Sequence, residues 1–404
     1  MKEGWEVKKL GEVGKVSMCK RVLKKQTNTD SGVPFYKIGT FGKEPNAYID
    51  EKLYQEFKAK YSFPKKGDVL LSASGTIGRR VVYDGEPAYF QDSNIVWIDN
   101  NESEVLNEYL YKFYGYCDWN ASKGATISRL YNDDLRRIEI PIPPIEEQKQ
   151  IVAILDDAFA AIEQAQANIE KNIDNAKELF QSKLNDVFSQ KGEGWEEKFI
   201  EEVSEVINGY SFKSNDFSAE NSVKAIKITN VGINEFVEGG SNNLPKNFLE
   251  KYSKVKVQEG DIVLALTRTI ISSGLKVARV PNSYNYSLLN QRVAAIIPKD
   301  NVVDGEYLYH FFSSKIVYNY VLSNVNTLMQ PNLSIKDLKR LKVPITSIDK
   351  QIQISKKIEE MSELKNFAIK KYQQKLTNLE DLKKSLLEKA FAGELTCNEP
   401  NPTH

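Results

Sequence analysis

The chain has 404 residues, which is long enough for more than one domain. It holds 55 basic and 55 acidic residues, so its zero net charge excludes a uniformly basic DNA-binding surface and leaves only local clusters. The start MKEGWEVKKL is too polar for a signal peptide, no apolar run approaches the roughly 20 residues that cross a membrane, and the cysteines match no metal spacing. These features predict a soluble cytoplasmic protein.

The first 145 residues mix short β-rich runs with turns. GDVLL from Gly67, RRVVY from Arg79 and NIVWI from Asn94 predict strands, which glycine-containing turns separate. Residues 105–121 carry aromatic and aliphatic side chains along one face and predict a helix. Residues 305–323 predict its counterpart later in the chain.

A long helix follows, because residues 146–188 contain no proline or glycine and their apolar residues recur at steps of three and four. A second such stripe lies near the C-terminal end. Its apolar positions are Ile354, Ile358, Met361, Leu364, Ala368, Tyr372, Leu376, Leu379, Leu382 and Leu386. Because such stripes avoid water, the two helices are expected to pack on each other as an antiparallel coiled coil.

The second half of the chain repeats the first. DLRRIEIPIPPIEEQKQI (134–151) and DLKRLKVPITSIDKQIQI (337–354) share nine of eighteen residues. Further collinear pairs start at Gly4 and Gly194, at Gly67 and Gly260, and at Tyr109 and Tyr307. This pattern indicates a duplication. Antiparallel pairing of equivalent helices predicts a pseudo-twofold axis, globular domains at opposite ends of a rod, and chain termini that lie close together.

No motif for bond-making chemistry is present. SASGTIGR (72–79) contains glycines but lacks the lysine of a phosphate-binding loop. His310 lies in an aromatic segment, where a packing role is expected, and His404 is the last residue. The sequence therefore predicts no catalytic residue and no metal site.

Basic and amide side chains cluster in loops at equivalent places of the two halves, while the loop contents differ. Arginine and amide side chains recognise base edges, and hydroxyl groups contact phosphates. The competing interpretation is that these are ordinary solvated loops. The candidate DNA-binding residues are Lys20, Arg21, Lys24, Lys25, Ser72, Ser74, Thr76, Arg79, Arg80, Lys123, Thr126, Arg129, Lys213, Lys227, Thr267, Arg268, Thr269, Ser272, Lys276, Asn290, Gln291, Arg292, Asn326, Gln330 and Asn332.

Over essentially its whole length the chain resembles the specificity subunits of Type I restriction-modification systems. The resemblance rests on GWEVKKLGEV and GWEEKF, KKGDVLLSASGTIG and QEGDIVLALT, IPIPPIEEQKQIV, and LKKSLLEKAFAGEL near the end. The second copy has PITSIDKQIQI and lacks the double proline of the first.

The resemblance implies an α+β fold with two similar target-recognition domains, at 1–145 and 191–346, separated by two long antiparallel coiled-coil helices. The spacer helices would span 146–190 and 347–392, with a tail at 393–404. Such a subunit is not an enzyme: each domain would recognise one half of a bipartite double-stranded DNA target, and the helices would set the spacing.

The same resemblance implies two methyltransferase subunits and a restriction/translocase subunit as partners. It implies no cofactor in this chain, since S-adenosylmethionine, ATP and Mg²⁺ would belong to those partners. Two alternatives remain open at this point. One is a non-DNA adaptor with a coiled-coil rod and two protein-binding β-rich domains, and the other is an enzyme fused to a recognition module.

Overall fold

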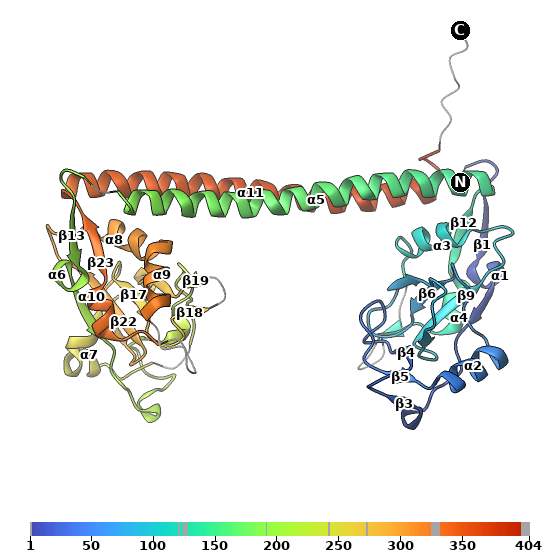
Figure 1. The fold of residues 1–404 in the computed structure, drawn as a ribbon, viewed down its shortest axis with the longest axis horizontal. Coiled ribbons are helices and arrows are strands. Elements are labelled where there is room, and N and C mark those ends of the chain that lie inside the picture. Colours follow the sequence, from blue (N-terminus) through green and yellow to red (C-terminus); the bar gives the residue numbers. More distant parts are fainter. Residues whose placement is uncertain are drawn as a thin grey trace, which may run out of the picture. The chain divides into compact units, whose positions relative to one another are not determined.

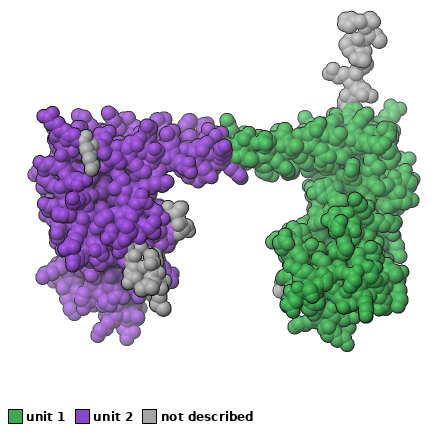
Figure 2. All heavy atoms as spheres, viewed as in Figure 1, with its two compact units in different colours: residues 1–169, 374–404 green, residues 170–373 purple. Residues whose placement is uncertain are grey.

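The computed structural model describes residues 2–119, 122–123, 128–190, 192–240, 243–271, 274–324 and 332–396, and only the backbone of residues 122, 123, 128 and 129. The chain divides into two compact units, residues 1–169 with 374–404 and residues 170–373 (Figure 2). Two long helices, α5 (Ile145–Phe188) and α11 (Ile348–Ala392), each contribute one part to both units (Figure 1). The predicted domain boundaries divide the chain more finely and stay a prediction.

Unit 1 contains an antiparallel sheet of order β2-β9-β6-β7 and a second sheet of order β3-β5-β4-β8, in which β4 and β8 pair in parallel. Separate two-stranded ribbons are formed by β1 with β12 and by β10 with β11. The elements are β1 (Glu6–Lys9), α1 (Leu10–Val13), β2 (Lys15–Ser17), η1 (Lys24–Gln26), β3 (Thr27–Asn28), β4 (Val33–Tyr36), β5 (Tyr48–Ile49), α2 (Glu51–Lys60), β6 (Val69–Ser72), β7 (Arg80–Val82), β8 (Tyr89–Phe90), β9 (Ile95–Asp99), α3 (Asn107–Tyr114), β10 (Ser122–Lys123), β11 (Ser128–Arg129), α4 (Asn132–Arg137) and β12 (Glu139–Ile142).

Unit 2 repeats this plan with a sheet of order β14-β22-β17-β20, a sheet of order β15-β21-β16 and the ribbon β13-β23. A small hairpin, β18 with β19, is added. The elements are β13 (Glu196–Phe199), α6 (Ile200–Val203), β14 (Ser204–Asn208), η2 (Ser214–Asp216), β15 (Ala225–Ile226), η3 (Ile228–Asn230), α7 (Phe248–Lys251), η4 (Ser253–Val255), β16 (Lys256–Val257), β17 (Ile262–Ala265), β18 (Ile270–Ile271), β19 (Gly274–Leu275), β20 (Val277–Arg279), η5 (Asn282–Tyr284), β21 (Ser287–Leu289), β22 (Val293–Pro298), α8 (Gly305–Phe312), α9 (Lys315–Asn324), α10 (Ile335–Arg340) and β23 (Lys342–Ile345).

The predicted strands at GDVLL, RRVVY and NIVWI are confirmed as β6, β7 and β9. Strand β6 is apolar on both faces because it lies between two cores. Val69 and Leu71 belong to the core shared with the long helices, while Leu70 points into the core of the second sheet. Strand side chains alternate between faces, so a strand buried on both sides needs an unbroken apolar run.

The repeated Gly-Asp before each central strand forms the same turn twice. Gly67 and Gly260 have φ of +92° and +87°, a conformation that favours glycine. The carboxylates of Asp68 and Asp261 then each accept a hydrogen bond of 2.7 Å from a backbone N–H three residues earlier. Burial raises the pKa of both carboxyl groups. The Gly-Asp repeat is therefore a structural turn.

Each long helix is fastened to its domain by a fully buried glutamine. The side-chain amide of Gln148 donates to the carbonyls of Glu104 and Pro143, and its oxygen accepts from the N–H of Leu106. Gln351 makes the equivalent bonds in unit 2, to the carbonyls of Val302 and Thr346 and from the N–H of Asp304. The duplicated segment is thus a joint that fixes where the helix leaves the domain.

The far end of the other helix closes each unit. In unit 1, Phe391 at the end of α11 packs edge-on against Tyr109 and Phe113 of α3. In unit 2, Phe188 at the end of α5 packs in the same way against Tyr307 and Phe311 of α8. The start of one helix therefore lies with the end of the other in both units, which confirms the antiparallel pairing.

The first and last described residues, Lys2 and Thr396, lie together in unit 1, which agrees with the predicted closeness of the two termini. The ammonium group of Lys2 donates to the carbonyl of Thr396 at 2.7 Å and to the carboxylate of Glu147 at 2.6 Å. Burial alone would raise the pKa of Glu147, but hydrogen bonds from Lys2, Thr396 and Trp5 lower it overall. The N-terminal segment is thereby bound to the start of α5 and to the segment that follows α11.

The helical segments near residues 105–121 and 305–323 differ from the prediction. Helix α3 is shorter than expected and ends at Tyr114; the N–H of Gly115, which follows, bonds to the carbonyl of Lys112. The second segment is two helices, α8 and α9, broken at Ser313–Ser314. The hydroxyl of Ser314 bonds to the carbonyl of Phe311 at 2.6 Å, because serine side chains compete with the helical backbone for hydrogen bonds.

The predicted apolar stripe of α11 is wrong at two positions. Leu364 and Leu382 are 69% and 47% exposed, and Phe367, one turn after Leu364, is 61% exposed. The buried contacts of α11 lie near its two ends, at Ile358 in unit 2 and at Leu387, Ala390 and Phe391 in unit 1. Within the described ranges, none of the helices combines the length and apolar character needed to cross a bilayer.

We predict that replacing either joint glutamine with leucine destabilises its own unit by about 3 kcal/mol, because buried backbone groups lose their hydrogen bonds. Urea unfolding of Gln148→Leu and Gln351→Leu, with hydrogen exchange as the readout for each unit, measures the loss of stability. The matched controls are Gln150→Leu and Gln353→Leu, exposed glutamines on the same helices. Equal loss of stability in controls and joint variants would contradict the assignment.

Candidate nucleic-acid interface

The loop after β6 in unit 1 is organised by buried hydroxyl groups. Ser72 accepts a hydrogen bond from the N–H of Arg79 at 2.9 Å and donates to the carbonyl of Thr76, and Ser74 donates to the side chain of Asn94 at 2.8 Å. Ser72 and Ser74 are buried, whereas Thr76 between them and Arg79 is exposed. The serines therefore shape the loop that presents Thr76.

Two arginines close this loop against the domain. The guanidinium of Arg79 donates to the carbonyl of Phe41 at 3.0 Å. That of Arg80 lies 4.5 Å from the ring centre of Tyr111 on α3. Both side chains are half-buried. Arginine on an aromatic face keeps its donors available to a further partner.

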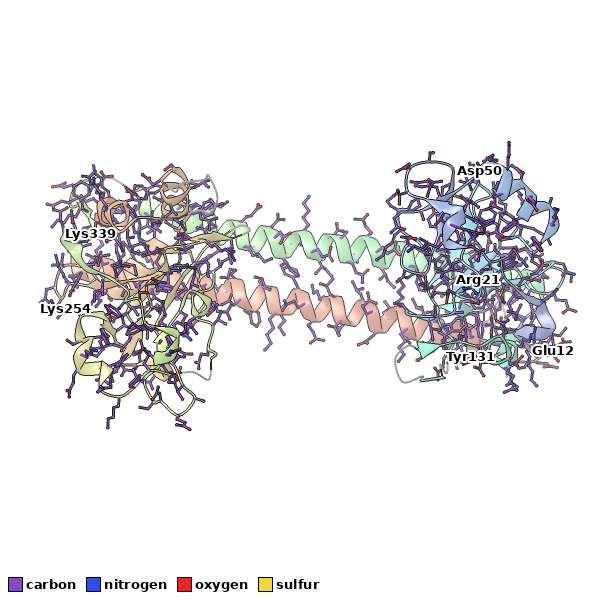
Figure 3. All side chains as sticks on the ribbon, turned by 90° about the horizontal axis from the view of Figure 1, so that it is seen from below. Glu12, Arg21, Asp50, Tyr131, Lys254 and Lys339 are labelled. Carbon is purple, nitrogen blue, oxygen red and sulfur yellow. The ribbon has the colours of Figure 1, made fainter. Side chains whose placement is uncertain are left out.

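A polar hollow of about 510 Å³ lies beside this loop. It is lined by cations and amides of three segments that are far apart in the sequence. Arg21, labelled in Figure 3, comes from the segment between β2 and η1. Its other polar lining residues are Lys24, Thr27, Lys37, Gln91, Asp92, Ser93 and Asn94.

Unit 2 has a corresponding hollow of about 280 Å³, lined among others by Lys224, Lys227, Asn230 and Tyr284. The ammonium group of Lys224 lies 4.3 Å from the ring centre of Tyr284, and that of Lys227 lies 4.2 Å from the ring centre of Phe217. Aromatic rings and cations at one surface suit the charged backbone and flat bases of a nucleic acid.

Lys37 and Lys227 occupy equivalent positions in the two hollows. Each follows a short parallel strand, and each N–H bonds to the polar side chain three residues later, Thr40 at 3.2 Å and Asn230 at 2.9 Å. The sequence analysis overlooked Lys37, although YKIGT from Tyr36 and IKITN from Ile226 align at a constant offset. Lys224, Gln91 and Asn94 were overlooked as well.

The structure sorts the candidate residues by exposure. Ser72, Ser74 and Thr269 are buried within their loops. The predicted contact of their side chains with DNA stays a prediction, and their burial does not favour it. Half-buried candidates are Arg79, Arg80, Lys227, Thr267, Lys276 and Asn290. Exposed candidates are Lys20, Arg21, Lys24, Lys25, Thr76, Lys213, Arg268, Gln291, Arg292 and Asn332. Thr126, Ser272, Asn326 and Gln330 lie outside the described residues, and Lys123 and Arg129 are described only by their backbone.

The described basic candidates have no carboxylate partner among the described residues. Some lysines and arginines of the helices and ribbons do bind carboxylates, for example Lys112 with Asp156 and Lys8 with Glu104. In the described part of the chain, Arg21, Arg268 and the other described basic candidates form no ion pair, which would require a carboxylate oxygen within 4.0 Å of the side-chain nitrogen. The described basic candidates therefore keep a positive charge that no described carboxylate pairs, as lysines of α11 such as Lys356 and Lys370 also do.

One cluster resembles a metal site. Glu306 and His310 on α8 and Glu359 on α11 each place a ligand atom within 4.8 Å of the others. Arg279, however, binds the carboxylate of Glu306 and so supplies the positive charge there. Burial, with Arg279 close by, lowers the pKa of His310 to about 4. This arrangement favours helix packing, and the absence of a metal site stays a prediction.

A duplicated α+β domain with cationic loops, mounted on paired helices, defines a nucleic-acid-recognition protein with two binding domains. The family model described as the Type I restriction modification DNA specificity domain matches residues 2–172 and again 192–379. The chain belongs to this family. The resemblance to specificity subunits, the α+β fold and the internal repeat predicted from the sequence are thereby confirmed.

Relatives with names agree with this assignment. A Haemophilus influenzae protein named as a type I restriction enzyme specificity subunit is 63% identical over 151 residues, which are 37% of this chain and 39% of that protein. The MjaVIII specificity subunit of Methanocaldococcus jannaschii is 29% identical over 69% of this chain and 67% of its own length. The Escherichia coli EcoBI specificity subunit is 22% identical over 92% of this chain and 81% of its own.

Solved structures share the fold. The chain aligns with a subunit from a structural study of complex assembly and conformational transition in a type I R-M system, with a TM-score of 0.73 at 16% identity over 98% of this chain and 99% of that one. The HsdS subunit from Thermoanaerobacter tengcongensis aligns with a TM-score of 0.59 at 18% identity over 98% of both chains.

We predict that His310 makes unit 2 sensitive to acid. Because the folded pKa of about 4 lies below the ordinary 6.5, stability is full above pH 6.5 and falls by up to about 3 kcal/mol as the pH approaches 4. Urea unfolding between pH 7 and pH 4 should show this loss in the wild type and a smaller loss in His310→Gln. Parallel curves for the two proteins would refute the prediction.

Proposed function

We propose that the chain is the DNA specificity subunit of a type I restriction-modification complex and recognises a bipartite double-stranded target, one half-site per domain. The observation that carries the proposal is the contrast between frame and loops. Both domains share the same joints, turns and four-stranded antiparallel sheet, whereas the cationic loops differ in sequence and length. One scaffold with two binding surfaces suits two different half-sites.

The proposal assigns the chemistry to other subunits. This chain performs recognition, and two methyltransferase subunits and a restriction/translocase subunit supply catalysis in the cytoplasm, where the DNA lies. S-adenosylmethionine, ATP and Mg²⁺ then belong to those partners. The long helices set the spacing between half-sites and provide a docking surface. The adaptor alternative has no comparable support, since the relatives are specificity subunits.

Deletion of the gene tests recognition directly. Genome-wide methylation mapping of the host, with and without an in-frame deletion, should show one bipartite motif that loses methylation at every occurrence. Restoring the gene on a plasmid should restore the same motif. An unchanged methylome while the partner methyltransferase is expressed would overturn the proposal and favour an adaptor.

The exposed apolar residues of α11 are proposed to receive a methyltransferase subunit. Leu364 and Phe367 are one turn apart on the same helix face, and a monomer gains nothing from exposing both. Leu364→Glu combined with Phe367→Glu should leave the thermal midpoint nearly unchanged and reduce co-purification of the methyltransferase at least about tenfold, because each buried side chain contributes about 1.5–3 kcal/mol.

The matched control is Glu363→Gln, an exposed residue of the same helix. It should leave both the thermal midpoint and the co-purification unchanged. Undiminished co-purification of the double variant would place the methyltransferase elsewhere on the chain.

A further inference from the structure

One backbone position is left-handed in both domains but carries different residues. Ala73 and Leu266 are equivalent, because each N–H bonds to a carbonyl before the neighbouring strand (Asn94 at 2.7 Å, Arg292 at 2.9 Å). Each carbonyl also accepts a bond of 2.9 Å, from Leu130 or Leu333. Two residues further on, unit 1 has Gly75 with φ +68° and unit 2 has Arg268 with φ +49°.

The two residues tolerate this conformation unequally. Glycine adopts positive φ freely, whereas the Cβ of an arginine approaches the following carbonyl at a cost of about 1–2 kcal/mol. Unit 2 thus retains a strained arginine where its sister domain uses an unstrained glycine. Such strain persists only where the surroundings hold it, and it concentrates at functional positions.

The surroundings of Arg268 do hold it. Thr267 on one side forms a β-bridge with Asn332. Thr269 on the other side is fully buried, and its carbonyl accepts the N–H of Lys276 at 2.9 Å. The backbone is therefore fixed on both sides, while the side chain of Arg268 is exposed.

The charge around Arg268 is positive. Burial, and secondly the charge of Arg268, lower the pKa of Lys276, whose ammonium group bonds to the carbonyl of Ile228 at 2.7 Å. In the described ranges no carboxylate pairs with either cation. The exposed Arg292 directly precedes the neighbouring strand β22, and its carbonyl accepts the N–H of Leu266. The vicinity of Arg268 thus attracts an anionic ligand and is not neutralised from within.

We propose that Arg268 contacts the edge of a guanine in the half-site of the second domain, and that the first domain has no side chain at the equivalent place. The inference rests on the proposed function and names one of its specificity-determining residues. A phosphate contact requires only charge, which a lysine at this position would supply equally well. Arginine, in contrast, has a planar guanidinium group that presents two donors to O6 and N7 of guanine in one geometry.

Stability and recognition should respond in opposite directions when Arg268 is changed. Arg268→Gly removes the strain and should raise the thermal midpoint of unit 2, while recognition of the guanine is lost. The matched control is Asn301→Gly, which also replaces an exposed residue with positive φ in unit 2, outside the cationic loops. It should keep the motif unchanged. A lower thermal midpoint for Arg268→Gly would overturn the strain argument.

The experiment maps methylated motifs in cells that express the whole complex with wild-type chain, Arg268→Gly, Arg268→Lys or Asn301→Gly. The expected result is that both Arg268 variants lose selectivity at one guanine–cytosine pair of one half-site, while the other half-site stays intact. Methylation at the original motif should fall at least about tenfold, in line with about 1–3 kcal/mol per base contact.

Two results would overturn the inference. An unchanged motif in Arg268→Gly would show that the residue makes no specific contact. Uniform weakening at all sites, with Arg268→Lys behaving as wild type, would show a phosphate contact. If the wild-type complex itself methylates no bipartite motif, the proposed function fails and this inference fails with it, so the two failures are distinguishable.

Discussion

The structure depends on two buried glutamines. Gln148 and Gln351 each fasten the start of a long helix to the loop before the domain's aromatic helix and to the turn that leads into the long helix. Neither side chain is accessible to solvent, so each bond that fails leaves a buried backbone group unpaired. Tyr109 and Tyr307 strengthen the same joints through hydrogen bonds of 2.8 and 2.7 Å to the carbonyls of Pro141 and Pro344.

The joints determine the direction in which each long helix leaves its domain. The loops therefore do not have to fix that direction. The loop after β6 and the loop after β17 leave equivalent strands, yet the second contains an additional hairpin and a left-handed arginine. Neither difference reaches the joint. A protein whose framework is fixed at one side of each domain can vary the loops that remain, and recognition surfaces commonly lie on such loops. The duplication therefore separates the part that positions from the part that recognises.

Much of this architecture was predictable from one sequence. The helix 146–188 and its partner follow from a long apolar period without proline or glycine, and the repeat follows from collinear matches such as those at Gly67 and Gly260. The exposure of Leu364 was not predictable, since periodicity identifies an apolar stripe but not what covers it. The break at Ser314 involves one hydroxyl bond, and the burial of Thr269 falls in a loop that has no periodic apolar pattern.

The zero net charge conceals local differences in how cations are paired. Some cations of helices and ribbons, such as Lys112 and Lys8, lie beside carboxylates, where each exposed pair contributes about 0–1 kcal/mol. In the described loops, cations such as Arg21 and Arg268 have no such partner. Their attraction for DNA phosphates is therefore retained at short range but screened within about 10 Å at 0.1 M salt. Under the proposed function, a neutral chain with unpaired loop cations would be drawn weakly to DNA in general, and its affinity would depend on close fit at the two half-sites.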